Sequence, residues 1–255
     1  YPLRRQRQMC IRDSFHAFVR HRLLSKAQRS KPRPVHYNTW EGIYFQHDVE
    51  TLKTLADEVA ALGVERFVLD DGWFKGRRGD FAGLGDWTVD AAVYPQGLSP
   101  LINHVNSLGM EFGIWFEPEM VNPDSDLYRA HPDWVLQTSG NPQLRFRNQL
   151  VLDLSRAEVT NYLFSAIDAI LSQYPLIRYI KWDINRDLNH PGNALGKPAV
   201  HQQTQALYAL IDRIKAAHPG LEIESCSSGG ARIDYGVLAH TDRVWTSDSN
   251  DALDR

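Results

Sequence analysis

The fold is decided by a short strand-like stretch that ends on a carboxylate, IRYIKWD at residues 177–183. Tyr, Ile and Trp favour strands, and helical patterns bound the run on both sides. Before it, apolar residues recur at helical spacing from Val159 to Leu171, and after it a second helical pattern covers residues 202–217. A strand between two helices with short connections predicts parallel βαβ units.

The same alternation continues in both directions from this stretch. Strands are predicted at residues 36–45, 66–69, 111–116, 177–183, 221–226 and 243–248. Helix starts are predicted at Asp48 as an N-cap, at Ser99 as a cap before Pro100, and at a capping box formed by Ser155 and Glu158. Residues 150–154 also have a strand pattern. Only a short helix, residues 125–131, separates them from the previous strand, so we expect them to lie outside the main sheet.

Two α/β architectures are compatible with this alternation, a barrel and a doubly wound sheet. No Gly-rich phosphate turn follows the first strand, which argues against the doubly wound sheet. Charged and aromatic residues follow strand after strand at its C-terminal end, where barrel enzymes build their active sites. The sequence therefore predicts an α/β fold of the TIM (β/α)8 barrel type, truncated after about six strands, and we expect the chain to be cut at both ends.

The first residues need a separate interpretation. Residues 4–14 show no strand or helix periodicity, and a widely used transposon adapter of sequencing libraries encodes them without a mismatch. We interpret residues 1–14 as an assembly artefact from this adapter. Residues 15–34 are then a linker into the barrel, and residues 35–255 are a partial (β/α)8 catalytic barrel.

Composition excludes several classes of function. The formal net charge of −3 gives no basic footprint for nucleic acid, and no apolar run is long enough to cross a membrane. The ten His show no paired spacing typical of a metal site, so no metal and no cofactor are expected. Cys10 and Cys226 are too few for a disulfide framework. With Cys10 inside the adapter segment, the remaining cysteine suits a reducing compartment, and a cytoplasmic location is expected.

Carboxylates gather at the predicted C-terminal ends of the strands. A single carboxylate at such a position often only caps the next helix. Several acids that converge with tryptophans on one barrel face, without His, instead suit a neutral polyhydroxylated substrate. The acids are Asp70, Asp71, Glu117, Glu119, Asp183, Glu224 and Asp248, and the tryptophans are Trp40, Trp73, Trp115, Trp182 and Trp245.

Asp183 is the best candidate for a catalytic nucleophile. Side chains alternate along a strand, so Lys181, Asp183 and Asn185 share one face. A lysine beside a carboxylate favours its ionised form, and an ionised carboxylate is the species that attacks an anomeric carbon. Glycoside hydrolysis needs a second, protonated carboxyl group, for which Asp248 is well placed. Asp251 is close enough to compete, and spacing alone does not decide between them.

Six segments in a fixed order carry a resemblance to a known family. They are LDDGW (69–73), GDW (85–87), WFEPEM (115–120), KWDINR (181–186), CSSGG (226–230) and WTSD (245–248). Together they resemble the catalytic barrel of the α-galactosidases of glycoside hydrolase family 36, in clan D, over residues 36–255. One such motif is weakly specific, whereas six in register are strongly specific.

The resemblance implies a role for each matching position. Asp183 matches the nucleophile and Asp248 the general acid/base of a retaining reaction, and Asp70 and Asp71 match carboxylates that bind the O4 and O6 side of galactose. The remaining matches are pocket residues: Lys181 and Arg147 contacting ring hydroxyls, Trp115 as a stacking wall, Trp40 as part of the pocket, and Cys226, Ser228 and Gly229 as its edge.

The function implied is that of a retaining exo-α-galactosidase acting on small oligosaccharides of the melibiose and raffinose type. The family resemblance also implies a parent protein that is a homo-oligomer, often a tetramer. Three alternatives share these motifs or part of them. They are a raffinose-synthase-like galactosyl transferase, an α-N-acetylgalactosaminidase or α-glucosidase cousin, and a non-catalytic sugar-binding relative. Intact Asp183 and Asp248 argue against the last.

Overall fold

A computed structural model describes residues 2–24, 31–249, 251 and 253. Its centre is a parallel sheet of six strands, in the order β1-β2-β3-β6-β7-β8. The strands are β1 (His36–Asn38), β2 (Arg66–Leu69), β3 (Glu111–Phe116), β6 (Ile177–Trp182), β7 (Glu222–Ser225) and β8 (Arg243–Val244). Strand order follows chain order without reversal, as in a barrel and unlike a doubly wound sheet. The prediction of a truncated barrel is confirmed.

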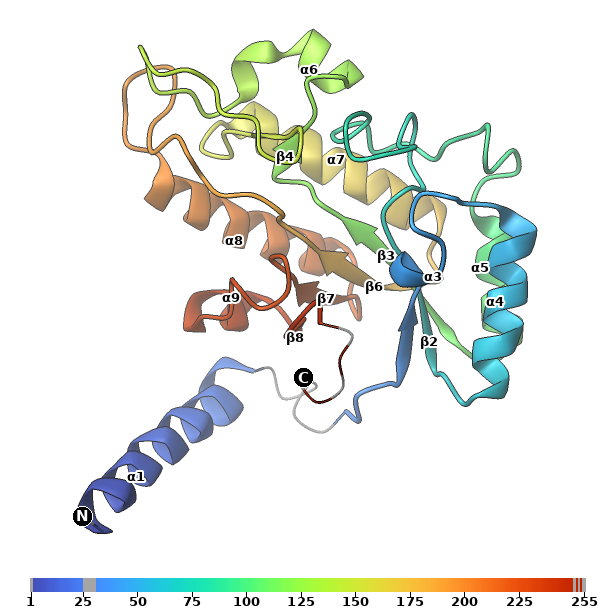
Figure 1. The fold of residues 1–255 in the computed structure, drawn as a ribbon, viewed down its shortest axis with the longest axis horizontal. Coiled ribbons are helices and arrows are strands. Elements are labelled where there is room, and N and C mark those ends of the chain that lie inside the picture. The colour runs from blue at the N-terminus through green and yellow to red at the C-terminus, as the bar shows by residue number, and fades with distance from the viewer. Residues whose placement is uncertain (1, 25–30, 250, 252, 254–255) are drawn as a thin grey trace.

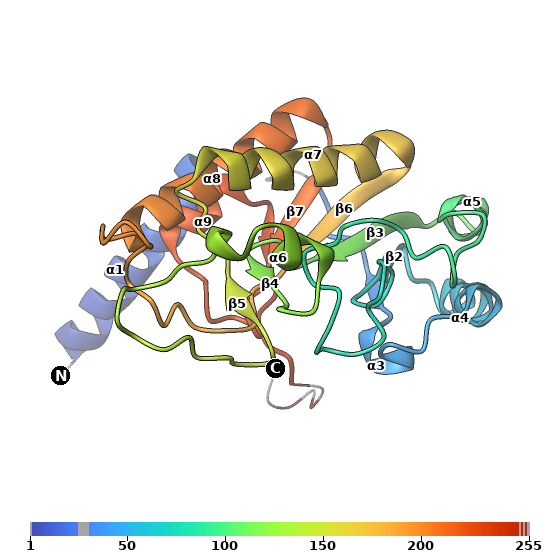
Figure 2. The same ribbon diagram turned by 90° about the horizontal axis from the view of Figure 1, so that it is seen from above.

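The sheet curls so strongly that its two edge strands approach each other. His36, at the start of β1, stacks on Trp245, which follows β8, with ring centroids 6.0 Å apart. Four long helices cover the outer face of this curved sheet (Figures 1 and 2). They are α4 (Val49–Ala61), α5 (Ser99–Ser107), α7 (Ala157–Gln173) and α8 (Val200–Ala217). These helices do not cover the concave side of the sheet or the C-terminal ends of its strands.

Helix packing follows the apolar stripes of the sequence. Val159, Leu163 and Ile167 of α7 are fully buried against the sheet and the neighbouring helix α8. A stripe at this spacing forms because residues three and four apart share one face of a helix. Among the described residues, no helix is both long enough and apolar enough to cross a membrane.

One of the three predicted helix starts is confirmed. Asp48 caps α4 and accepts a hydrogen bond from the Thr51 N–H at 2.8 Å. Ser99 is already helical, because the N-cap of α5 is Leu98, so that prediction was wrong by one residue. The capping box at Ser155 was wrong as well.

Neighbouring charged groups explain the failed capping box. The Ser155 hydroxyl donates to Asp153 instead of accepting from the helix. Glu158 pairs with Arg156, at 2.7 Å, instead of reaching back to the N-cap backbone. Helix α7 therefore begins after Arg156, without a side-chain cap.

The first predicted strand, residues 36–45, is correct only over β1. At Asn38 the chain turns, because the Asn38 side chain accepts a hydrogen bond from the Trp40 N–H at 2.8 Å. The short helix α3 (Trp40–Ile43) follows and ends at Tyr44, whose φ of 46° lies in the left-handed region. Such side-chain bonds to the local backbone compete with strand formation.

Residues 150–154 lie outside the main sheet, as predicted. Strand β5 (Leu150–Val151) pairs antiparallel with β4 (Met120–Val121) in a separate two-stranded sheet. Two short helices lie between these strands in the sequence, α6 (Asp126–Ala130) and the 3-10 helix η2 (Pro132–Trp134). The remaining short helix, α9 (Tyr235–His240), precedes β8.

The N-terminal segment is helical, contrary to our expectation from its periodicity. Helix α1 (Pro2–Phe18) continues into the π-helix η1 (Val19–Leu23) and projects away from the sheet (Figure 1). Phe15 and Phe18 contact Tyr235 of α9, with ring centroids 5.9 and 6.1 Å apart. Part of the predicted linker is thus helical, while its residues 25–30 lie outside the described residues. The adapter origin of residues 1–14 stays a prediction.

Candidate active site

A cavity of about 320 Å³ lies at the C-terminal ends of the sheet strands. Most of the residues singled out from the sequence line it. They are Trp40, Asp70, Asp71, Trp115, Arg147, Lys181, Asp183 and Asp248. Barrel enzymes carry their active sites on this face, so the location agrees with the interpretation of the sequence.

The three remaining candidates, Cys226, Ser228 and Gly229, do not line this cavity. Cys226 is 1% exposed and its thiol interacts with Asp183. Burial, followed by the charge of Asp183, raises the pKa of the Cys226 thiol well above its ordinary value, which keeps it a neutral thiol. Ser228 donates to the Asn185 side-chain oxygen at 3.1 Å. Gly229 packs so closely on residues 247 and 248 that a Cβ would lie 3.2 Å from the Asp248 nitrogen.

Asp183 follows β6 directly and is held by three donors. Its Oδ2 accepts from the Trp115 indole at 3.1 Å and from the Asn185 amide at 2.7 Å. Its Oδ1 accepts from the Ile184 N–H at 2.9 Å. Donors to both oxygens fix the orientation of the carboxyl group. Asp183 is 6% exposed and faces the cavity, so the arrangement suits a preorganised nucleophile.

Lys181 does not pair with Asp183 in the way that the strand pattern predicted. Its ammonium lies 3.0 Å from Asp70 Oδ2, across the cavity floor. Burial acts to lower the pKa of Lys181. The negative charges of Asp70 and then Asp183 raise it by a larger amount, so the pKa lies above its ordinary value. The lysine is therefore a permanent cation between two carboxylates, which leaves donors to offer a polar ligand.

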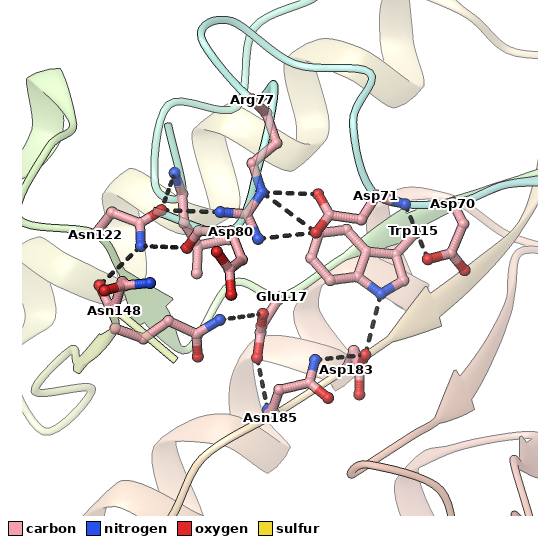
Figure 3. A network of polar contacts seen from close by, with 12 residues as sticks. Asp70, Asp71, Arg77, Asp80, Trp115, Glu117, Asn122, Asn148, Asp183 and Asn185 are labelled. Carbon is pink, nitrogen blue, oxygen red and sulfur yellow. Dashed lines mark hydrogen bonds and ion pairs between the residues drawn. The ribbon is translucent and has the colours of Figure 1, made fainter. Parts of the chain in front are cut away.

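Asp71 is held by an arginine that the sequence reading did not identify. Arg77 Nη2 lies 2.8 Å from Asp71 Oδ2, and Nε lies 2.9 Å from Oδ1 (Figure 3). Burial lowers the pKa of Arg77, and the charge of Asp71 raises it by more. The remaining Arg77 donor, Nη1, bonds Asn122, which in turn donates to the Asn148 carbonyl. This chain supports the loop that carries Arg147, whose φ of 50° is left-handed.

We expect Arg77→Leu to destabilise the fold strongly. The substitution leaves the buried Asp71 carboxylate unpaired, which costs about 3–5 kcal/mol of unfolding free energy. Arg78→Leu is the matched control, because Arg78 is more exposed and its bond to Asp90 contributes at most about 1 kcal/mol. Urea denaturation of both variants measures the difference. Similar losses of unfolding free energy in the two variants would show that the Arg77–Asp71 pair contributes no more than the Arg78–Asp90 pair.

Asp248 is exposed, in contrast to the buried Asp183. Its Oδ1 accepts from the Trp245 indole at 2.7 Å, and it lines the cavity, whereas Asp251 does not. The geometry therefore favours Asp248 over Asp251 as the second carboxyl group. The centroid of the Trp245 ring also lies 5.2 Å from the Lys181 ammonium. Trp245 therefore contacts both Asp248 and Lys181.

Other cavity-lining residues were not singled out as binding residues from the sequence. They are His36, Tyr37, Asn38, Glu41, Asn185 and Trp245. Asn185 had a signal, since it shares a strand face with Asp183. The first four of these residues lie on β1 and α3, in the region that the sequence predicted to be one longer strand. In the described part of the chain, no group of His, Cys, Asp and Glu has a metal-binding arrangement.

A parallel half barrel with buried carboxylates around a cavity at its strand ends defines the architecture of a barrel-type glycoside hydrolase. The Melibiase family model matches residues 7–255. The chain therefore belongs to the Melibiase family.

Relatives agree with this assignment. The chain is 52% identical over 243 residues to an α-galactosidase of Escherichia coli. The aligned region covers 95% of this chain and 34% of the relative. It is 43% identical over 248 residues to the α-galactosidase AgaA of Geobacillus stearothermophilus, again over 95% and 34%. The chain thus spans about a third of the length of the curated relatives it matches.

Solved structures show the same fold. The crystal structure of the family 36 α-galactosidase AgaA from Geobacillus stearothermophilus aligns with a TM-score of 0.88, covering 92% of this chain and 33% of that one. An AgaA variant in complex with 1-deoxygalactonojirimycin aligns with a TM-score of 0.89, covering 94% and 34%. Both are 43% identical to this chain, so the fold of this part of the barrel is shared.

Proposed function

We propose that the complete protein containing this chain is a retaining exo-α-galactosidase. The observation that carries the proposal is the pair of carboxyl groups on one cavity, Asp183 buried and fixed by three donors and Asp248 exposed. A fixed carboxylate suits attack on the anomeric carbon, and an exposed carboxyl group suits proton exchange with the leaving oxygen and water. The covalent galactosyl-enzyme formed on Asp183 gives net retention.

Two further carboxylates support galactose as the sugar. Asp70 is held by Lys181 and Asp71 by Arg77, so both point fixed acceptors at the cavity. We assign them to O4 and O6 of the sugar. An epimer with an equatorial O4 leaves such buried acceptors unsatisfied, which a polar site rejects strongly.

The relatives support the substrate class. AgaA variants have been crystallised in complexes with stachyose and with raffinose. Small oligosaccharides with terminal α-galactose are therefore the proposed substrates here. As the resemblance implies, we also propose that the complete protein is a homo-oligomer, often a tetramer. A single cysteine outside the adapter segment suits a reducing compartment, so we also propose a cytoplasmic location.

Substrate comparison tests this proposal. The complete protein is expected to cleave an aryl α-galactoside with a kcat/KM about 10³-fold or more above that for the α-glucoside or the α-N-acetylgalactosaminide. NMR should show α-galactose as the first product. Preferred transfer to sucrose over water would instead support the raffinose-synthase-like alternative, and binding without turnover the non-catalytic one.

A further inference from the structure

Glu117 is a buried carboxyl group directly behind the proposed nucleophile. It follows β3, is 1% exposed, and does not line the cavity. Its Oε1 accepts from the Asn185 N–H at 2.6 Å, and its Oε2 accepts from the Gln149 amide at 2.9 Å (Figure 3). The proposed mechanism gives this group no task, although a buried carboxyl group is costly to retain.

A short chain of hydrogen bonds connects Glu117 to Asp183. Glu117 holds the backbone of Asn185, and the Asn185 side chain donates to Asp183 Oδ2 at 2.7 Å. Ser228 donates to the other end of the same amide at 3.1 Å, so the amide cannot turn freely. Glu117 therefore fixes the residue that orients the nucleophile.

The charges around Glu117 oppose its ionisation. Among the described residues, no Lys or Arg nitrogen lies within ion-pair distance of it. Asp183 after β6 and Asp71 after β2 face it with negative charge. Arg77, already paired with Asp71, and Arg147 face it with positive charge. Burial, then Asp183, raises the pKa of Glu117 to about 8.

The surroundings also contain an acceptor for a proton on Glu117. Gln149 Oε1 is buried and has no hydrogen-bond partner. Turning the Gln149 amide by half a rotation places this oxygen against Glu117 Oε2, where it accepts the proton of a neutral carboxyl group. Glu117 Oε1 then still accepts from the Asn185 N–H.

We propose that Glu117 is a positioning residue that carries a proton while Asp183 is charged and holds it less tightly when Asp183 becomes an ester. In the first step an Asp183 oxygen bonds to the anomeric carbon as the bond to the leaving oxygen breaks, and that oxygen takes a proton from Asp248. Asp183 is then neutral, so one of the two largest causes of the raised Glu117 pKa is removed and that pKa falls. Hydrolysis of the ester restores the charge of Asp183 and, with it, the higher pKa of Glu117. The cycle, but not the resting protonation, rests on the proposed function.

Infrared spectroscopy tests the resting protonation without any turnover. At pH 7 the complete wild-type protein should show a carboxylic-acid C=O band that Glu117→Gln removes. Asp183→Asn, which takes away the negative charge of the nucleophile, should lower the pH at which this band disappears by about one unit or more. Glu119→Gln is the matched control, because Glu119 is equally buried but is ion-paired with Arg232, and it should leave the band in place. A band unchanged by Glu117→Gln, or a titration unmoved by Asp183→Asn, overturns the proposal.

Kinetics of an aryl α-galactoside test the positioning. Glu117→Leu should lower kcat about 100-fold with little change in KM, because the nucleophile loses its fixed orientation. Glu117→Gln should lose less than about tenfold, since its amide oxygen still accepts from the Asn185 N–H. Equal losses in both variants, or none in the leucine variant, overturn the positioning role. If the wild-type protein cleaves no α-galactoside, the proposed function fails while the infrared result still decides the protonation.

Discussion

Asp183→Ala is expected to lower kcat for an aryl α-galactoside by about 10⁴-fold or more in the complete protein. Removal of the carboxylate leaves no group at this position to form the covalent intermediate. It also leaves the Trp115 and Asn185 donors without their shared acceptor. Substrate binding should change much less, because Asp70, Asp71 and Lys181 still line the cavity.

Asp187→Ala is the control for this measurement. Asp187 is four residues further along the same loop but exposed, and it does not line the cavity, so its loss should change kcat by less than about twofold. Steady-state turnover of both variants, checked for folding by circular dichroism, gives the comparison. Near wild-type turnover in Asp183→Ala would show that the nucleophile is another group.

The sequence predicts the central strands well because residues close together in the sequence determine them. Strands β2 and β3 occur at the predicted residues, since continuous apolar runs bounded by turns leave few alternatives. The start of the barrel is less predictable. There the Asn38 side chain binds the Trp40 backbone and ends β1 early, and nothing in the periodicity reveals that bond.

The sequence does not reveal which side chains form ion pairs with the site residues. Strand alternation correctly places Lys181 and Asp183 on one face, yet the closest carboxylate to the Lys181 ammonium is Asp70, on a strand two positions away. The length of the loop at residues 74–98 is typical of a functional loop. Its pattern does not tell which of its basic residues turns inward, and only the fold shows that Arg77 binds Asp71 while Arg78 stays near the surface.

Asp248→Ala is expected to have an effect that depends on the leaving group. For raffinose, whose leaving sugar oxygen needs a proton, kcat/KM should fall by about 10³-fold or more. For a dinitrophenyl α-galactoside, whose leaving group is stable as an anion, the fall should be less than about tenfold. Measuring kcat/KM isolates the first step, so slower hydrolysis of the intermediate does not obscure the difference.

Asp251→Ala separates the two carboxyl groups that the sequence left open. Both are exposed, but only Asp248 lines the cavity and accepts a hydrogen bond from Trp245. Loss of Asp251 should therefore reduce kcat/KM for both substrates by less than about twofold. An equal loss on both substrates in Asp248→Ala, together with a leaving-group dependence in Asp251→Ala, would move the acid/base role to Asp251. The position of Asp248 on the cavity makes a leaving-group dependence in Asp248→Ala the expected result, because the group that gives a proton to the leaving oxygen must lie next to the bound sugar.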